Sequence, residues 1–277
     1  HDVVARIRRL AGTRKVGHAG TLDPMATGVL VVGVQQATRL LGHLALTEKE
    51  YLGTIRLGQA TSTDDAEGEI TAQASAGQVT EVELRAAAAE LTGQIQQVPP
   101  GISAIKVGGE RAYRLTRAGA APELKARTVT VSALDILRLR REGDLLDLDV
   151  AVTCSSGTYI RAIARDLGAA LLTGGHLTAL RRTRVGPYRI ADAATLDELA
   201  ADLRVVPMAA AAAAAFERLD LTEEQATLVG HGGRLARDAG HRAEHDRPVA
   251  AFGPDGELVA LLTAREESYQ PVAVFVG

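Results

Sequence analysis

Residues 17–30, with the sequence GHAGTLDPMATGVL, combine three glycines, a proline, a histidine and one carboxylate in fourteen positions. The apolar residues 29–34 follow directly and predict a strand buried on both faces. A glycine-rich loop beside such a strand suits a site where the backbone approaches a ligand closely. Asp23, the only acid between Asp2 and Glu48, is therefore either a turn-forming residue or a chemical group. Local features alone favour the turn, because Asp before Pro commonly starts one.

The composition indicates a globular protein with an aliphatic core. The 277 residues are enough for one large domain, or for a large and a small one. The chain has no Trp, three Phe and five Tyr, so Leu, Val, Ile and Ala must fill its interior. Cys154 is the only cysteine, which excludes a disulfide within the chain and fits the reducing cytoplasm. No apolar run has the length of a membrane span.

The basic residues are clustered although the net charge is only −3. Residues 216–277 contain 6 basic and 11 acidic residues, so the remainder of the chain is slightly positive. Three basic clusters lie in that remainder: Arg6, Arg8, Arg9, Arg14 and Lys15; Arg111, Arg114 and Arg117; Arg181, Arg182 and Arg184. Such patches favour contact with a polyanion such as a nucleic acid. The alternative is that each cluster is a solvated surface.

Hydrophobic periodicity predicts alternating helices and strands in the first hundred residues. We expect helices over residues 2–11 and 37–46, and a strand over 48–57 that places Tyr51, Ile55 and Leu57 on one face. Thr80 and Glu83 form a capping box that starts a helix ending near residue 91. Residues 61–68 are a polar loop.

The second half of the chain is predicted to be richer in strands. A short strand at 102–107 precedes Arg111, Arg114 and Arg117, whose spacing places them on one face of a helix. Residues 127–139 and 145–153 predict an antiparallel hairpin, and 178–185 another strand. Ser156 or Thr158 is expected to cap a helix over 159–167 that Gly168 ends. After an alanine run at 209–215, residues 216–277 predict a β-rich module.

Several site types are disfavoured by the residues present. The acidic loop at 61–68 lacks the oxygen pattern of a calcium loop, and His241 and His245 lack a third ligand. A serine-nucleophile elbow is missing around Ser155 and Ser156. We therefore expect no metal and no cofactor.

Read together, the motifs resemble those of the bacterial tRNA pseudouridine-55 synthases, the TruB family. Residues 17–30 resemble the first motif of that family, and 50–51 with 56–68 the second. Residues 99–106 with 109–113 are similar to its RNA-gripping insertion, and 154–161 and 175–182 to its last two motifs. One departure is that the chain begins at His1-Asp2, where the family has a further segment carrying an Asp-Lys-Pro motif, so we expect residues upstream of His1.

The resemblance implies an α+β fold with a mixed, largely antiparallel sheet and flanking helices. It implies a catalytic domain over 1–208, with an RNA-gripping insertion at about 99–125, and a small PUA-like RNA-binding domain over 216–277. The implied reaction is the isomerisation of uridine 55 in the tRNA T loop to pseudouridine, by base flipping and by breaking and re-forming the glycosidic bond. The implied partner is the tRNA T stem-loop, and we expect a monomeric, cytoplasmic enzyme with no membrane or protein partner.

The resemblance also assigns roles to individual residues. Asp23 is the implied catalytic carboxylate and Arg161 its counter-charge, whereas Tyr51, Tyr159 and Leu180 form the wall for the flipped base. The RNA-binding residues are His18, Arg111, Arg114, Arg117, Arg181 and Arg182. Whether Asp23 attacks the sugar or the uracil ring, or assists an elimination, is left open.

Three other functions are compatible with parts of the sequence. A non-catalytic RNA-binding or RNA-folding protein would also carry basic clusters and a PUA-like tail. A pseudouridine synthase acting on another RNA, such as a guide-directed relative, would share the motifs. A glycoside hydrolase needs a second catalytic carboxylate, for which Asp64 or Asp65 is available.

Overall fold

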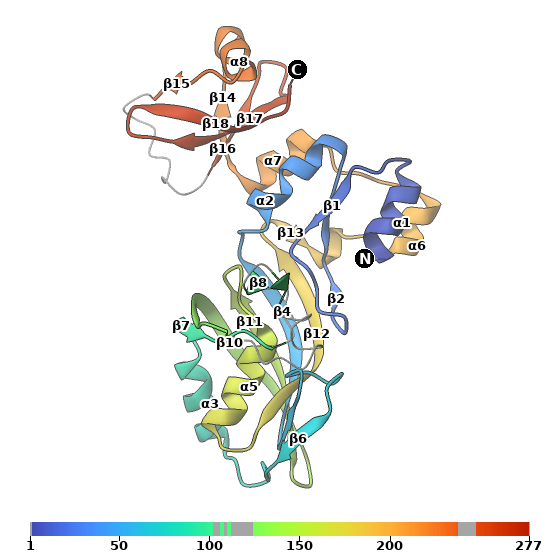
Figure 1. Cartoon of the computed structure of the whole chain (residues 1–277), viewed down its shortest axis with the longest axis vertical. Helices are drawn as coiled ribbons and strands as arrows, with labels where there is room; N and C mark the ends of the chain where they lie inside the picture. Colours follow the sequence, from blue (N-terminus) through green and yellow to red (C-terminus); the bar gives the residue numbers. More distant parts are fainter. Residues whose placement is uncertain (1, 102–105, 108–109, 112–123, 238–247, 277) are drawn as a thin grey trace. The chain divides into compact units, whose positions relative to one another are not determined.

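The computed structural model describes residues 2–101, 106–107, 110–111, 124–237 and 248–276 (Figure 1). Contacts divide the chain into two compact units. The terminal unit comprises His1–Thr21, Leu30–Ala45 and Gly186–Gly277, and the central unit comprises Leu22–Val29 and Leu46–Val185. The expected domains, 1–208 and 216–277, follow different boundaries and stay a prediction.

The central unit is built on a largely antiparallel sheet. Its strands run in the order β12 (Gly175–Val185), β4 (Lys49–Leu57), β11 (Leu145–Cys154), β10 (Arg127–Glu142) and β7 (Gly93–Gln97). The short strand β2 (Thr27–Gly28) pairs with β12 in parallel. The hairpin of β10 and β11 and the strand β4 confirm the predictions from alternation. The expected mixed, largely antiparallel α+β fold is confirmed.

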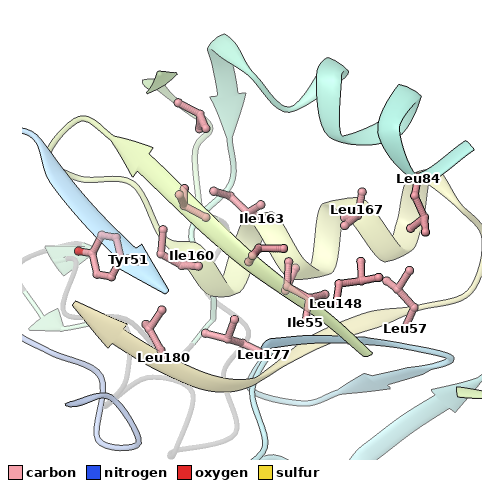
Figure 2. Packing of buried hydrophobic residues seen from close by; sticks show 14 of the residues in the cluster. Tyr51, Ile55, Leu57, Leu84, Leu148, Ile160, Ile163, Leu167, Leu177 and Leu180 are labelled. Atoms are coloured by element: carbon pink, nitrogen blue, oxygen red, sulfur yellow. The ribbon is translucent and has the colours of Figure 1, made fainter. Parts of the chain in front are cut away.

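The helices α3 (Glu81–Glu90) and α5 (Ile160–Ala170) supply apolar side chains to the same core as the strands. In β4, Tyr51, Ile55 and Leu57 are buried while Leu52 is exposed, as the two-residue period requires. Figure 2 shows Ile163 and Leu167 of α5 over Ile55 and Leu57. Burying each such aliphatic side chain contributes roughly 1.5–3 kcal/mol, so this layer holds the sheet in register.

The other face of the sheet is held by charged pairs. Arg56 of β4 donates two hydrogen bonds of 2.8 Å to Asp147 of β11. Thr54 donates to Asp149 at 2.9 Å, and Asp149 also binds Arg140 of β10. These contacts join three adjacent strands, β4, β11 and β10.

The two central helices show where local signals succeed and fail. The Thr80–Glu83 capping box at the start of α3 is confirmed. The predicted cap and end of α5 are wrong: Tyr159 is its N-cap without a side-chain cap, and the helix continues past Gly168 to Ala170. Gly168 serves close packing instead, since a Cβ there would lie 2.2 Å from the backbone carbon of Gly174.

Short elements complete the central unit. The strands β5 (Gln59–Thr61) and β6 (Ile70–Gln73) form a small hairpin around the polar loop. β8 (Lys106–Val107) pairs with β9 (Glu110–Arg111), so Arg111 lies in a strand and not in the predicted helix. Arg114, Arg117 and most of the predicted strand at 102–107 lie outside the described residues.

The amino-terminal part of the terminal unit contains α1 (Asp2–Leu10), as predicted, and a two-stranded sheet of β1 (Val16–Ala19) and β3 (Val31–Val34). The prediction of a strand over 29–34 buried on both faces is wrong: β3 begins at Val31, pairs only with β1 and is mostly half-buried. The helix predicted over 37–46 divides into a 3-10 helix η1 (Gln35–Arg39) and α2 (Leu41–Leu44).

The carboxy-terminal part of the terminal unit confirms a β-rich tail. Short elements lead to it: β13 (Tyr188–Arg189), η2 (Ile190–Asp192), α6 (Leu196–Ala201) and α7 (Met208–Ala215). The tail sheet has the order β14 (Glu217–Asp220), β16 (Val249–Phe252), β17 (Leu258–Ala264), β18 (Ser268–Val274) and β15 (Leu235–Ala236). The helix α8 (Glu223–Gly230) packs on it. Among the described residues, no helix combines the length and apolar character of a membrane span.

The central strands of the tail sheet, β16 and β17, are buried on both faces within the terminal unit. One face packs with Val229 of α8. The other face, including Phe252, Leu258 and Phe275, packs in one cluster with Ala19, Leu40, Leu41, Leu44 and Ala212. The tail therefore shares a core with the beginning of the chain.

Candidate active site

The loop over residues 22–29 is bound to the strand β12, which β2 joins in parallel. The N–H of Val29 donates to the carbonyl of Arg182 at 2.8 Å, and the Arg182 Nε donates to the carbonyl of Val29 at 2.8 Å. Gly28 has φ +103°, and a Cβ there would lie 2.1 Å from the Arg182 carbonyl oxygen. Only glycine fits this approach, which explains its place in the motif.

Asp23 begins a β-turn within this loop and also binds Arg161. The N–H of Ala26 donates to the Asp23 carbonyl at 2.9 Å, which closes the turn. Arg161 donates from Nε and Nη2 to the two Asp23 carboxylate oxygens at 3.0 and 2.8 Å. Such bidentate pairs are among the strongest charge-assisted hydrogen bonds in proteins. The side chain of Asp23 is 26% exposed and that of Arg161 only 5%, so the carboxylate faces solvent and the cation lies behind it.

Arg161 is held from a second side by the loop between β5 and β6. Its Nη1 donates to the carbonyl of Thr63 at 2.9 Å and lies 3.4 Å from a carboxylate oxygen of Asp65. The Asp65 side chain is only 3% exposed. One helical turn along α5, Arg165 pairs with Asp64 at 3.1 Å. The guanidinium of Arg161 thus lies between two carboxylates that come from different loops.

The polar loop at 61–68, which is rich in acids, contributes the Thr63 carbonyl, Asp64 and Asp65 as partners of the two arginines of α5. The sequence analysis did not predict these contacts. Burial raises the pKa of Asp64, although Arg165 and Arg161 oppose that shift. The available signal was the spacing of Arg161 and Arg165, which places both on one face of a helix. A buried arginine requires anionic partners, and a nearby acidic loop is one element that can supply them.

Tyr51 and Leu180 meet at one end of the central core. Both are buried, and Figure 2 shows them beside Ile160 at the first turn of α5. Burial raises the pKa of the Tyr51 hydroxyl, although Arg182, directly across the ladder from Tyr51, opposes that shift. A neutral phenol beside aliphatic side chains suits a planar ring stacked against it.

Tyr159 and His18 are half-buried. Tyr159 lies at the N-cap of α5, two residues before Arg161. His18 lies on β1 of the terminal unit, outside the unit that carries Asp23.

The predicted RNA-binding arginines occupy different environments. Arg181 is exposed on β12, and its guanidinium donates to the Thr27 hydroxyl at 3.3 Å. Arg182, by contrast, is buried, with 1% of the residue exposed, and it binds the Val29 carbonyl, so its predicted contact with RNA finds no support in this position.

Two further titratable groups lie on the inner face beside Tyr51. Lys49 is buried, and burial together with the positive charge of Arg182 lowers its pKa to about 8. Cys154 is opposite Lys49 on β11, and burial raises the pKa of its thiol to about 11. Among the residues that the structure describes, no three potential metal ligands converge.

The arrangement around Asp23 therefore combines an accessible carboxylate, a permanent cation behind it and a nearby apolar wall. A carboxylate of this kind can act as a nucleophile or accept a proton. The wall of Tyr51 and Leu180 can hold a planar, uncharged group.

Comparisons with known proteins agree along the whole chain. Residues 8–160 match a family model described as the TruB family pseudouridylate synthase N-terminal domain. Residues 161–213 match a tRNA pseudouridylate synthase B C-terminal domain, and 216–276 the C-terminal part of tRNA pseudouridine synthase II.

Relatives include the tRNA pseudouridine synthase B of Thermobifida fusca, which is 59% identical over 100% of this chain and 94% of that protein. The enzyme of the same name from an Arthrobacter species is 58% identical over 99% of this chain and 92% of its own. Among solved structures, an H/ACA RNP bound to a substrate RNA has a TM-score of 0.72 at 26% identity. An archaeal Nop10–Cbf5 complex has a TM-score of 0.71 at 27% identity. Both alignments cover 100% of this chain, with 81% and 82% of the matched chains.

Proposed function

The chain belongs to the TruB family of pseudouridylate synthases, and from that membership we propose that it uses Asp23 to convert uridine 55 of the tRNA T loop to pseudouridine. It is a tRNA-modifying isomerase. The observation that carries the assignment of Asp23 is its bidentate pair with Arg161, which holds an accessible carboxylate in a fixed orientation.

The reaction changes the atom through which uracil is joined to ribose. The bond between N1 and the sugar C1′ breaks, the ring turns, and a bond between C5 and C1′ forms. The C5 proton leaves and N1 gains a proton, so atoms and electrons balance without a redox partner. We assign Asp23 the nucleophilic carboxylate role in these steps: one of its oxygens forms a bond to the nucleotide, and that bond breaks again before the product leaves, which divides one difficult step into two.

A uridine inside a folded loop must leave its stack before Asp23 can reach it. The flipped base would lie against Tyr51 and Leu180, which form the apolar end of the central core. Tyr159 precedes Arg161 by two residues and supplies a further aromatic surface. Stacking on such side chains does not require a charge on the base.

The tRNA backbone would be held by surface arginines. Arg181 is exposed on the strand that also binds the loop of Asp23, so it can contact a phosphate near the reacting nucleotide. We further propose that the enzyme acts as a monomer in the cytoplasm.

The glycoside hydrolase alternative loses support from the contacts of its second carboxylate. Asp65 is buried against Arg161 and Asp64 is paired with Arg165. Neither is free to act as the second acid or base that glycoside hydrolysis requires.

A modification assay on defined RNAs tests the proposal. The purified chain is incubated with a T stem-loop RNA, and with the same RNA carrying cytidine in place of uridine 55. We expect pseudouridine in the first RNA and none in the second. Equal pseudouridine in both would refute the site assignment, and its absence from both, with modification of another RNA, would favour the guide-directed alternative.

A further inference from the structure

Gln97 makes a buried contact with α5 from outside that helix. It is the last residue of β7, and only 1% of the residue is exposed. Its Oε1 accepts a hydrogen bond from the backbone N–H of Tyr159 at 2.8 Å, and its Nε2 donates to the backbone carbonyl of Tyr159 at 3.1 Å. One side-chain amide therefore satisfies both backbone groups of a single residue, 62 positions away in the sequence.

The residue that Gln97 holds directly precedes the first residue of the helix that carries Arg161. Tyr159 is the N-cap of α5 and supplies no side-chain cap of its own. Cap contacts determine where a helix begins and the direction in which the chain enters it. Because Arg161 follows two residues later and binds both oxygens of Asp23, a shift of Tyr159 would displace that pair.

A second contact joins the same strand end to α5. The Arg165 Nη2 donates to the carbonyl of Val98 at 2.8 Å, while its Nη1 pairs with Asp64 at 3.1 Å. The segment of Gln97 and Val98 is thus fixed at the start of the helix and again at Arg165. It leads directly into the residues at 99–125 that resemble the RNA-gripping insertion.

We propose that Gln97 is a positioning residue for the isomerisation, acting through the backbone of Tyr159 on the Tyr159 ring and on the Asp23–Arg161 pair. The inference rests on the proposed function of Asp23. A glutamine is required because the contact needs a donor and an acceptor on one short, uncharged group. Small displacements of catalytic groups reduce the rate of the chemical step more than they weaken substrate binding.

The test is Gln97→Met, which keeps the approximate size of the side chain and removes both hydrogen bonds. The matched control is Gln96→Met, because Gln96 is the neighbour on β7, is exposed, and bonds the Thr128 hydroxyl at 2.8 Å. We measure kcat, the KM for a T stem-loop RNA and the midpoint of thermal unfolding. Gln97→Met is expected to lower kcat by roughly 10- to 100-fold while KM changes less than about 3-fold. Gln96→Met should keep both constants.

Two results would overturn the proposal. One is an unchanged kcat in Gln97→Met with only a lower unfolding midpoint, which would make Gln97 purely structural. The other is a rise in KM at constant kcat, which would make it an RNA-binding residue. If Gln97→Met does not fold, Gln97→Glu is used instead, because it keeps the shape of the side chain and the acceptor. A lower kcat at nearly constant KM then supports the positioning role, and an unchanged kcat overturns it.

Wild type and Asp23→Asn are assayed alongside, so that the two proposals fail separately. If the wild type forms no pseudouridine, the proposed function fails. If the wild type is active and Asp23→Asn is not, an unchanged Gln97→Met refutes only the role of Gln97.

Discussion

The partly exposed carboxylate of Asp23 and the buried guanidinium of Arg161 form an asymmetric ion pair. A cation that is enclosed by protein is screened less by salt than one at the surface. Asp65 and Thr63 hold the same guanidinium from its other side, so Arg161 keeps its place when Asp23 engages a substrate. The backbone of Asp23 closes a turn while its side chain remains available for chemistry.

Lys49 provides a prediction about pH at the scale of one residue. Its pKa is lowered from 10.5 to about 8, so above pH 8 the unfolded chain holds a proton that the folded chain has lost. The free energy of unfolding should therefore rise with pH, by about 1 kcal/mol from pH 8 to pH 9. Above pH 9 the raised pKa of Cys154 acts in the opposite sense, and so does that of Tyr51 above pH 10. Lys49→Met should abolish the rise.

Urea unfolding at pH 7, 8 and 9 checks this expectation. Lys15→Met is the matched control, because Lys15 is exposed. Its replacement should leave the pH dependence of the free energy of unfolding the same as in the wild type. Parallel pH profiles for wild type and Lys49→Met would show that Lys49 does not titrate in this range.

At the scale of elements, the loop over residues 22–29 depends on its contact with β12. Gly28→Ala would place a methyl group 2.1 Å from the Arg182 carbonyl oxygen, at a φ of +103° that alanine rarely adopts. We expect a loss of about 2–4 kcal/mol in the free energy of unfolding, together with a lower kcat because Asp23 lies in the same loop. Gly12→Ala is the comparison: φ is +60° there, and no atom lies within 4 Å of the added Cβ. Its cost should be about 1–2 kcal/mol, and equal losses for the two variants would contradict the steric account.

The elements that could be predicted are those whose pattern is set by local chemistry. The two-residue period of β4 and the capping box of α3 depend on neighbouring residues alone, and both are confirmed. The end of α5 could not be predicted, because Gly168 serves the approach of residue 174 and not a helix stop. The strand predicted over 29–34 is too long for a similar reason: residue 29 forms its backbone hydrogen bond with β12, whereas β3 pairs with β1.

Within the site, too, features that depend on neighbouring residues could be predicted, and features that depend on distant contacts could not. The pairing of Asp23 with Arg161 agrees with the family resemblance, whereas composition and periodicity alone favoured a turn. Asp65 and Gln97 were missed, because nothing local marks a side chain whose partner lies far along the chain. The burial of Arg182 was missed because an arginine in a basic run reads as a surface residue.

At the scale of the whole molecule, the tail belongs to the terminal unit and completes its core. Phe252, Leu258 and Phe275 of the tail share a cluster with Leu40 and Leu41. Deleting residues 216–277 should therefore expose residues 30–45, since each leucine loses roughly 1.5–3 kcal/mol of burial.

Hydrogen exchange on the truncated chain measures this effect. We expect backbone amides in residues 30–45 to exchange faster than in the full chain, while those of β4 and β11 keep their protection. Unchanged exchange in 30–45 would instead support the predicted boundary between a self-sufficient domain over 1–208 and a separate tail.

The most direct test of the account is a single-turnover assay of Asp23→Asn on a T stem-loop RNA, with RNA binding measured on the same preparation. Asparagine keeps the size of the side chain and the turn at Ala26 but cannot act as the carboxylate nucleophile. We predict binding within about 3-fold of wild type and a rate of pseudouridine formation reduced by at least roughly 10⁴-fold. Pseudouridine formation at a rate near that of the wild type would show that Asp23 is not the catalytic group.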